Sequence, residues 1–555
     1  MGKWIVCAAW PYVNSVPHLG TFIHLLSADI FKRYLHLKGE EAISVTGSDE
    51  HGTPIEVEAI KSGISPKQLT DKYHKEIVDL LGKYRINFDN YTRTENKTHI
   101  DFTQTFYKRI FDNDYIFTKQ VELPYCQKCD RFLPDRFIEG TCTYCGSDKA
   151  RGDQCDACGR ILDPLEVKDP KCAFCKTTPI IKKSTHWFFD LPKLSDKLKF
   201  FLDSNKQMPD NARNFSYKWL EEGLRSRALT RDNKWGIPSP FPNSEGKTIY
   251  VWLEALLGYV SATKEWAEKQ GNPQLWKDFW FDRETKSIFF IGKDNIPFHT
   301  IILPALLMAS EEEYILPWQI SSTEFILYES HGKFSKSRRI GVWMDEALEI
   351  AEPEYWRFVL ALIRPETKDA NFTWEEFERR INNDLNDAIG NFIHRTLAFI
   401  NSNFDGVIPT PSKLKDRDKI IQEEIINSSK VVGDLFDKIR IRDALNTIID
   451  LARLGNQYFS DKEPWHKMDK DVEDASTTLY IATQLVHSLS ILLQPFLPFV
   501  AEEIWKQLNM SGEVVSQRWE MASELNVKSG HKIGQIKPLF HKVKANEIKE
   551  NRKVT

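Results

Sequence analysis

Eight of the nine cysteines fall between residues 126 and 175, where they form four Cys-x-x-Cys pairs. The pairs are Cys126/Cys129, Cys142/Cys145, Cys155/Cys158 and Cys172/Cys175, whereas Cys7 stands alone. A Cys-x-x-Cys turn places two thiolates on one side of a tight loop, and two such turns build the tetrahedral sulfur cage that Zn²⁺ favours. The segment therefore predicts two closed, structural metal sites in a chain that is otherwise poor in cysteine.

The spacing of the pairs leaves their grouping open. Because the two middle pairs are close in sequence, we expect an inner site of Cys142, Cys145, Cys155 and Cys158 and an outer site of Cys126, Cys129, Cys172 and Cys175. Iron–sulfur ligation is the competing interpretation, but an electron carrier would normally show further redox motifs. Thioredoxin-type redox chemistry fits less well, because four such motifs would not crowd into one short segment.

Length and composition restrict the class of protein. The chain has 555 residues, which at roughly 150 residues per domain suggests three or four domains. Hydrophobic residues at 41% and charged residues at 28% exclude a disordered chain. The net charge of −4 excludes a protein that coats nucleic acid by bulk charge, but not one with local basic patches. The N-terminus has no signal-peptide pattern and no apolar run reaches about 18 residues, so we expect a cytoplasmic protein without a membrane anchor.

The first 50 residues predict a parallel sheet. Residues 3–9 form an apolar run typical of a buried strand, residues 21–38 an amphipathic helix, and residues 42–46 a second strand. Strand, helix and strand in this order make a βαβ unit. A similar pattern returns after the cysteine segment, at residues 248–259 and 287–290. We therefore expect an α/β fold of the Rossmann type, interrupted by a metal-binding insertion.

From about residue 376 the pattern changes to long amphipathic helices. Helical spacing covers residues 376–401, 420–435, 444–458 and 475–508, with short loops between them. This pattern predicts an all-α bundle at the C-terminal end of the chain.

Two motifs far apart in the sequence have the composition of phosphate-binding loops. His18-Leu19-Gly20-Thr21 stands at the start of the first helix, where free backbone N–H groups and the positive helix end bind anions. The run GKFSKSRR at residues 332–339 puts four cations and two hydroxyls in one loop, which suits a mobile clamp on a polyphosphate. It lacks the pattern of a P-loop NTPase. Taken alone, each motif is also typical of an ordinary capping loop or a solvated basic loop.

Taken together, the two motifs resemble the signature pair of the class I aminoacyl-tRNA synthetases. Four further segments resemble the methionyl branch of that family, namely AWPY at 9–12, GSDEHGTP at 47–54, YVWLEA at 250–255 and IGKD at 291–294. The four cysteine turns of the insertion also match this branch. The resemblance extends from residue 3 to about residue 545.

The resemblance implies an enzyme that activates L-methionine with ATP to methionyl-adenylate and transfers it to the 3′ end of tRNA(Met), the initiator tRNA included. It implies two structural Zn²⁺ ions, Mg²⁺ bound with ATP, and a monomer that a separate tRNA-binding module can accompany. One alternative is a synthetase of the valyl, isoleucyl and leucyl group, but the insertion is too short for the large editing domain of that group. The other is a non-catalytic zinc-ribbon relative that binds tRNA, which the intact His18, Asp49 and Lys336 disfavour.

The same resemblance divides the chain into six parts. A Rossmann catalytic domain occupies residues 1–118 and 231–320, and the connective insertion with two zinc knuckles occupies residues 119–230. A linking domain that contacts the tRNA stem follows over residues 321–375. The α-helical anticodon-binding domain then covers residues 376–510, and a C-terminal extension covers residues 511–555.

Residues for catalysis and for ATP are carried over from the family by position. The expected catalytic residues are His18, Thr21, Lys333 and Lys336. The residues expected around ATP are Pro11, His18, Gly20, Thr21, Gly292, Asp294, Ser335 and Lys336. Two positions depart from the family pattern. Thr21 stands where histidine is more usual, with His24 one turn on as a candidate substitute, and the clamp ends in Ser337-Arg338-Arg339 without the common glycine.

Two binding surfaces complete the implied site. The methionine pocket is expected to be lined by Ala9, Trp10, Tyr12, Asp49, Trp252, Leu256, Tyr259 and His299. Aromatic rings suit a thioether, and Asp49 matches the family's carboxylate for the substrate ammonium. Asn391, Arg395 and Trp465 match positions that read the CAU anticodon, where stacking and hydrogen bonds to base edges recognise unpaired bases. Without the family context, Trp252, Tyr259 and Trp465 would be assigned to packing.

Overall fold

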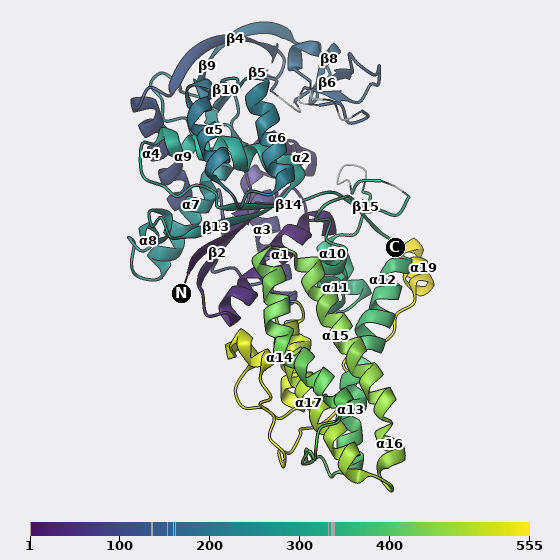
Figure 1. The fold of residues 1–555 in the computed structure, drawn as a ribbon. Coiled ribbons are helices and arrows are strands. Elements are labelled where there is room, and N and C mark those ends of the chain that lie inside the picture. Colours follow the sequence, from purple (N-terminus) through teal and green to yellow (C-terminus); the bar gives the residue numbers. More distant parts are fainter. Residues whose placement is uncertain are drawn as a thin grey trace.

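The computed structural model describes residues 2–134, 137–152, 154–158, 160, 162–330, 332–334 and 339–554 (Figure 1). At the centre of the catalytic part lies a five-stranded sheet in the order β14-β13-β1-β2-β3. Its strands are β1 (Lys3–Ala8), β2 (Glu41–Ser48), β3 (Asn90–Arg93), β13 (Lys286–Gly292) and β14 (Gln319–Thr323). Every neighbouring pair in this sheet is parallel. The α/β fold with a parallel sheet, expected from the sequence, is confirmed.

Strand β1 lies in the middle of the sheet, and its side chains alternate between two cores. Trp4, Val6 and Ala8 pack in one core with helix α1 (Leu19–Leu37). Ile5 and Cys7 pack in the other with helix α7 (Val251–Lys269). Because neighbouring residues of a strand face opposite sides, α1 and α7 cover opposite faces of the sheet. Burial on both faces explains why the sequence of β1 is apolar throughout rather than alternating.

Helix α1 begins two residues earlier than the sequence predicts. The Nδ1 atom of His18 accepts a hydrogen bond from the backbone N–H of Thr21 at 3.2 Å and so caps the helix before Leu19. The other helices of this part are α2 (Thr53–Ser62), α3 (Pro66–Lys83), α4 (Lys97–Asp112), α8 (Lys277–Trp280) and α9 (Leu303–Ala309).

After α4 the chain forms a long antiparallel arm. Strand β4 (Ile116–Cys126) pairs with β9 (Ile180–Phe189) along its length. The short strands of this region are β5 (Arg131–Phe132), β6 (Ile138–Thr141), β7 (Ala150–Arg151), β8 (Lys168–Cys172), β10 (Arg227–Ala228), β11 (Thr230–Arg231) and β12 (Thr248–Ile249). Helices α5 (Ser195–Ser204) and α6 (Asp210–Glu221) follow the arm. The cysteine segment lies at the end of the arm, at the upper right of Figure 1.

A helical bundle extends from the sheet toward the bottom of Figure 1. Its helices are α12 (Trp374–Arg379), α13 (Asn391–Asn403), α14 (Asp416–Asp437), α15 (Ile441–Lys462), α16 (Pro464–Lys467), α17 (Val472–Leu493) and α18 (Pro498–Gln507). A π-helical stretch, Arg380–Gly390, joins α12 to α13. The helical pattern over 475–508 is interrupted between α17 and α18, because Pro495 and Pro498 lack the N–H groups that a continuous helix needs.

Two smaller segments connect the sheet and the bundle. Strand β15 (Ile326–Tyr328) pairs in parallel with β16 (Ala370–Phe372), and α10 (Met344–Ile350) and α11 (Pro353–Leu362) lie between them in sequence. The chain after α18 returns along the bundle, where the buried indole of Trp519 donates to the carbonyl of Ser429 at 2.8 Å. The last helix, α19 (Ala545–Val554), packs against α12.

One buried arginine joins the sheet to the bundle. Arg357 of α11 is fully buried, and its Nη2 lies 2.8 Å from a carboxylate oxygen of Asp29 in α1. The same guanidinium donates to the carbonyl oxygens of Pro495 at 2.9 Å and Phe496 at 2.8 Å. Because one rigid cation bonds both parts, the turn between α17 and α18 is fixed against α1.

None of the helices in the described part of the chain is long and apolar enough to span a membrane.

Candidate active site

The carboxyl ends of β1, β2 and β13 meet at one edge of the sheet, and the segments after them carry most of the predicted site residues. The N–H of Ala9 donates to the carbonyl of Phe290 at 2.9 Å. The N–H of Asp49 donates to the carbonyl of Pro11 at 2.9 Å, and Tyr12 bridges to Asp49. This edge is where open parallel sheets bind ligands.

Trp10 occupies a slot between two glycines at this edge. A Cβ atom at Gly47 or at Gly258 would lie only 2.6 Å or 2.7 Å from the Trp10 ring. Tyr259 stands edge-on to the indole, with ring centroids 6.4 Å apart and an interplanar angle of 83°. The indole Nε1 is buried and has no hydrogen-bond partner among the described residues.

Tyr259 and His299 form a buried hydrogen-bonded pair. The Nδ1 atom of His299 lies 2.9 Å from the carbonyl oxygen of Asn295, so Nδ1 carries the proton. Its Nε2 then accepts from the Tyr259 hydroxyl at 2.9 Å. Burial lowers the pKa of His299 to about 4, so the imidazole is neutral. A π-helical turn, Phe298–Ile302, places His299 here, and such turns are frequent at functional sites.

Trp252 lies in the first turn of α7 and is 43% exposed. Its indole N–H donates to the Tyr12 hydroxyl, and Phe298 packs edge-on against it at a centroid distance of 5.0 Å. Leu256, one turn further along α7, is buried in the same core as Tyr259. The structure thus places the residues expected to line the methionine pocket after β1 and β2, along α7 and on the π-helical turn.

Asp49 follows β2 directly and is 3% exposed. Its Oδ1 atom has no hydrogen-bond partner among the described residues. Burial raises the pKa of Asp49 well above its usual value, and the charge of Glu254 raises it further, while His51 opposes the shift. A carboxylate in this setting gains strongly from a cationic ligand, because the cation restores the stabilisation lost on burial.

The sequence reasoning missed a buried histidine between two carboxylates. The Nδ1 of His51 lies 2.5 Å from Glu254, and its Nε2 lies 2.7 Å from Glu95. Burial lowers the pKa of His51, but the two carboxylates outweigh burial and raise the pKa to about 10. His51 and Glu254 both belong to segments that resemble the methionyl branch, and that resemblance was the available signal. Their pairing depends on how α7 packs against β2.

A second missed group surrounds Glu50. The Arg93 Nε lies 2.8 Å from a Glu50 carboxylate oxygen, and the Trp235 indole donates to the Glu50 carbonyl at 2.5 Å. Burial raises the pKa of Glu50 to about 6 despite the Arg93 contact. Glu56 links this region to the antiparallel arm of β4 and β9 that carries the cysteines, called the cysteine arm below. Arg131 of β5 donates to the Glu56 carboxylate at 2.8 Å.

The two motifs that were expected to bind phosphate lie next to each other in the structure. His18 lies before α1, and its ring centroid is 5.3 Å from that of Phe334 in the basic loop. A Cβ at Gly20 would lie 3.2 Å from the His18 ring and 3.8 Å from Phe334. Thr21 is half-buried beside them, and Lys333 is exposed, with its ammonium 3.6 Å from the Phe325 ring centroid. The expected residues Ser335 and Lys336, with Ser337 and Arg338, lie outside the described residues.

His24 lies in α1, about one turn after Thr21. Its Nε2 bonds the Thr323 hydroxyl at 2.9 Å, and a Cβ at Gly292 would lie 3.3 Å from its ring. Burial, together with the charges of Arg364 and His18, lowers the pKa of His24 to about 3, so its imidazole carries no charge near neutral pH. Gly292 ends β13 beside it, and Asp294 is exposed in the short helix that follows.

The residues expected to read the anticodon gather on one face of the bundle. The Arg395 guanidinium lies 5.7 Å from the Trp465 ring centroid and 5.0 Å from that of Phe459. Asn391 donates to the side chain of Asn456 at 3.5 Å. Phe459 and Asn456 were missed, because helical periodicity does not distinguish them from residues of the bundle core.

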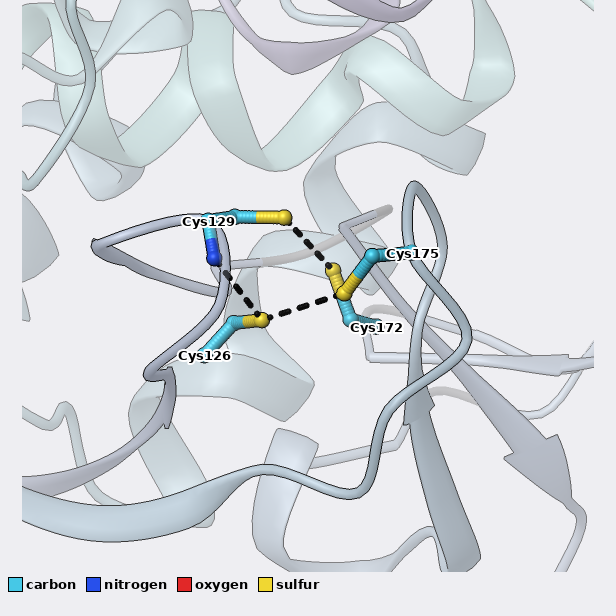
Figure 2. A group of neighbouring side chains, drawn as sticks. All are labelled: Cys126, Cys129, Cys172 and Cys175. Atoms are coloured by element: carbon cyan, nitrogen blue, oxygen red, sulfur yellow. Dashed lines mark hydrogen bonds between the residues drawn. The ribbon is translucent and has the colours of Figure 1, made fainter.

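The cysteines form the two nested groups that we expected. Figure 2 shows Cys126, Cys129, Cys172 and Cys175 with their sulfur atoms turned toward one another. The Sγ–Sγ distances are 3.3 Å for Cys126–Cys175 and 3.9 Å for Cys129–Cys172. In the inner group they are 4.0 Å for Cys142–Cys158 and 3.7 Å for Cys145–Cys155.

These distances test the fit of a metal ion. All sulfur atoms within each group lie within 4.8 Å of one another, and all eight thiols are free of disulfides. A tetrahedral Zn²⁺ with Zn–S bonds of about 2.3 Å separates its sulfur ligands by about 3.8 Å. Both groups therefore fit one four-coordinate ion each.

Comparison with known proteins assigns the chain to a family. The family described as "tRNA synthetases class I (M)" matches residues 4–397, and "Anticodon binding domain of methionyl tRNA ligase" matches residues 408–554. A methionine–tRNA ligase of Thermofilum pendens is 52% identical, over 99% of this chain and 96% of its own length. One of Saccharolobus solfataricus is 50% identical, over 98% and 95%.

A solved structure agrees in fold. The Mycobacterium tuberculosis methionyl-tRNA synthetase in complex with methionyl-adenylate superimposes with a TM-score of 0.81 at 24% identity, covering 97% of this chain and 100% of its own. The sequence resemblance is therefore confirmed, and the chain belongs to the methionine–tRNA ligases, the methionyl branch of the class I aminoacyl-tRNA synthetases.

Proposed function

We propose that this methionine–tRNA ligase uses ATP to activate L-methionine at the edge formed by β1, β2 and β13, and then esterifies tRNA(Met), the initiator tRNA included. The observation that carries the proposal is the edge of the sheet at the ends of β1 and β2, where the buried carboxylate of Asp49 lies near the rings of Trp10 and Tyr259. The capped helix α1 follows β1 in the chain. Together they offer an apolar wall, a counter-charge for an ammonium group and an anion-binding helix end.

The methionine side chain is proposed to lie among Trp10, Tyr259 and His299. A thioether is polarisable and packs favourably against aromatic rings. The neutral His299 and the Tyr259 hydroxyl satisfy each other, so neither exposes an unpaired donor to the apolar substrate. Trp252 and Tyr12 are hydrogen-bonded to each other at the N-terminal end of α7. They are proposed to cover the bound amino acid.

The substrate ammonium is proposed to bind Asp49. The unpartnered Oδ1 accepts a hydrogen bond from the ammonium. The positive charge of the ammonium compensates the buried carboxylate for the water that it has lost. The His51 imidazolium keeps the neighbouring Glu254 from adding its full negative charge to the pocket.

His18, Gly20 and Thr21 are proposed to hold the ATP phosphates at the start of α1, with Pro11, Gly292 and Asp294 toward the base and ribose. Free N–H groups at a helix start bind phosphate oxygens, and Mg²⁺ bound to ATP would share the phosphate charge. The methionine carboxylate attacks the α-phosphorus, and pyrophosphate leaves. Lys333, Lys336 and Ser335 are proposed to stabilise the charge that builds on the phosphates.

In the second step, a hydroxyl of the terminal tRNA adenosine attacks the methionyl carbonyl, and AMP leaves. Trp465, Arg395 and Asn391 are proposed to read the anticodon at the other end of the molecule. The chain is proposed to act as a monomer, with any further tRNA-binding module supplied by a separate protein.

Each cysteine group is proposed to hold one structural Zn²⁺ in a reducing cytoplasm. Four thiolates complete a tetrahedral shell and leave no position for a substrate, so the ions organise the arm rather than the reaction. The arm in turn contacts the catalytic part through Arg131 and Glu56.

ATP–pyrophosphate exchange tests the proposal. Methionine is expected to support exchange, and valine, isoleucine and leucine are not, after which the enzyme should charge tRNA(Met). Exchange with a branched amino acid in place of methionine would favour the valyl, isoleucyl and leucyl group. Binding of tRNA without any exchange would favour a non-catalytic relative.

A further inference from the structure

Trp465 lies on a short connection between two long helices. Helix α15 ends at Lys462, and Glu463 turns the chain with φ of 41°, in the left-handed region. The four-residue helix α16 then carries Trp465, whose side chain is 40% exposed. A non-glycine residue in the left-handed region is conformationally costly, so contacts elsewhere must hold this connection in place.

One buried carboxylate holds both ends of the connection. Asp474, in the first turn of α17, is 3% exposed. One of its oxygens lies 2.6 Å from Nζ of Lys462, and the other lies 2.6 Å from Nζ of Lys467. The two lysines stand on either side of Trp465 in the sequence. The two bonds therefore close a loop around the residues that carry the indole.

Further groups reinforce this arrangement. Lys462 also lies 2.8 Å from Asp418, and Lys415 lies 3.0 Å from Asp474. Burial alone would raise the pKa of Asp474, but hydrogen bonds from Lys462, Lys467 and Lys415 outweigh it and hold that pKa well below its usual range. The carboxylate is therefore ionised at neutral pH.

We propose that Asp474 is a positioning residue for anticodon recognition, which fixes the Trp465 indole beside Arg395 by holding Lys462 and Lys467. The inference rests on the anticodon role proposed above for Trp465. Asp474 acts through the connection, because its own carboxylate is buried and bonded to lysines. An aromatic ring that is fixed before tRNA arrives loses less conformational entropy on binding.

If Asp474 acted only through its negative charge, its removal would affect tRNA binding in the opposite direction from the positioning role. An acidic group close to an RNA-binding surface repels phosphates, so its loss should strengthen tRNA binding. Loss of positioning should weaken tRNA binding. Glu473 provides a matched control, because it is the neighbouring residue on α17, carries the same charge and is exposed.

The test compares aminoacylation with adenylate formation. Asp474→Asn is expected to raise the KM for tRNA(Met) about tenfold, the size of one lost stacking contact. ATP–pyrophosphate exchange with methionine is expected to stay at the wild-type level. Asp474→Glu, which keeps a carboxylate, should recover part of the loss, and Glu473→Gln should leave the KM for tRNA unchanged or lower it.

A double-mutant cycle with Trp465→Ala decides the mechanism. If Asp474 acts through Trp465, Asp474→Asn adds no further loss of kcat/KM for tRNA in the Trp465→Ala background. Additive losses, or a KM for tRNA that falls in Asp474→Asn, would overturn the positioning role. If Trp465→Ala alone leaves aminoacylation unchanged, the proposed anticodon role fails first and the positioning role with it. Should Asp474→Asn unfold at the assay temperature, Lys467→Gln removes only one of the two bonds and enters the same cycle.

Discussion

The Nδ1 atom of His51 lies 2.5 Å from a carboxylate oxygen of Glu254, a residue 203 positions later in the chain. Both side chains are buried, and the second ring nitrogen of His51 faces Glu95. The other oxygen of Glu254 has no partner among the described residues. Because the charge of Glu254 raises the pKa of Asp49, this pair adjusts the acidity of the carboxylate proposed to bind the substrate.

Stability should depend on pH through this pair. The folded state raises the pKa of His51 from 6.5 to about 10, so the stabilisation is complete below pH 6.5 and is lost as the pH rises toward 10. Glu254→Gln removes the main partner of the imidazolium. The difference in the free energy of unfolding between wild type and Glu254→Gln should therefore be largest below pH 6.5 and should shrink toward pH 10 in urea titrations. A difference that grows with pH would contradict this prediction.

Tyr259→Phe should weaken methionine binding. The change removes the donor to His299 Nε2 and leaves a buried acceptor unpaired. We expect the KM for methionine in ATP–pyrophosphate exchange to rise about fivefold, equivalent to about 1 kcal/mol, with little change in kcat. Tyr84→Phe is the control, because the Tyr84 hydroxyl is also buried but donates to the carbonyl of Met344. An equal rise in KM in both variants would point to a general loss of stability.

The two cysteine groups should lose zinc independently. Cys142→Ser removes one ligand of the inner group, so elemental analysis of the purified variant should find one zinc ion per chain, held by the outer group. Cys7→Ser should retain both ions, because Cys7 is buried in β1 and belongs to neither group. Two ions with unchanged ligation in Cys142→Ser would refute the nested grouping.

Removal of the buried Arg357 guanidinium should lower the free energy of unfolding strongly. Among the described residues, Arg357→Met leaves Asp29 with Arg33 as its one remaining cation, and it removes the bonds to the α17–α18 turn. We expect the free energy of unfolding to fall by about 3–5 kcal/mol, as for other broken buried ion pairs. Arg379→Met breaks a partly exposed ion pair with Glu376 and should cost less than about 1 kcal/mol. If the free energy of unfolding fell by similar amounts in the two variants, burial of the Arg357–Asp29 pair would not contribute to stability.

Lys336→Ala should impair adenylate formation but not methionine binding. The cation is proposed to stabilise charge that builds on the phosphates, so its loss should abolish most adenylate formation while methionine binding stays intact. Equilibrium binding of methionine and ATP–pyrophosphate exchange, measured on one preparation, check this. Near-normal exchange would remove Lys336 from the catalytic residues.

The fold was predictable where burial alone decides the sequence pattern. An apolar run at residues 3–9 allows little except a central strand, and β1 is observed over Lys3–Ala8. Element ends were less predictable, because they depend on particular side chains. The His18 ring caps α1 before Leu19, and Pro495 and Pro498 interrupt the helical pattern expected over 475–508.

Candidate site residues could be named from the sequence only where they lie in a local motif. The resemblance named Trp10, Asp49 and Tyr259, but no local pattern shows that Gly47 and Gly258 make room for the Trp10 ring. The partners of His51 come from separate elements, so their pairing depends on tertiary packing. Long-range electrostatic contacts of this kind leave no periodic trace in a single sequence.

The antiparallel pairing of β4 and β9 explains how a catalytic sheet tolerates so large an interruption. Ile116 lies opposite Phe189, so the chain departs and returns at neighbouring points. A segment whose two ends are adjacent can grow, shrink or be exchanged without displacing the elements that flank it. The arm therefore leaves the catalytic part as an antiparallel branch and does not interrupt the parallel register of the central sheet.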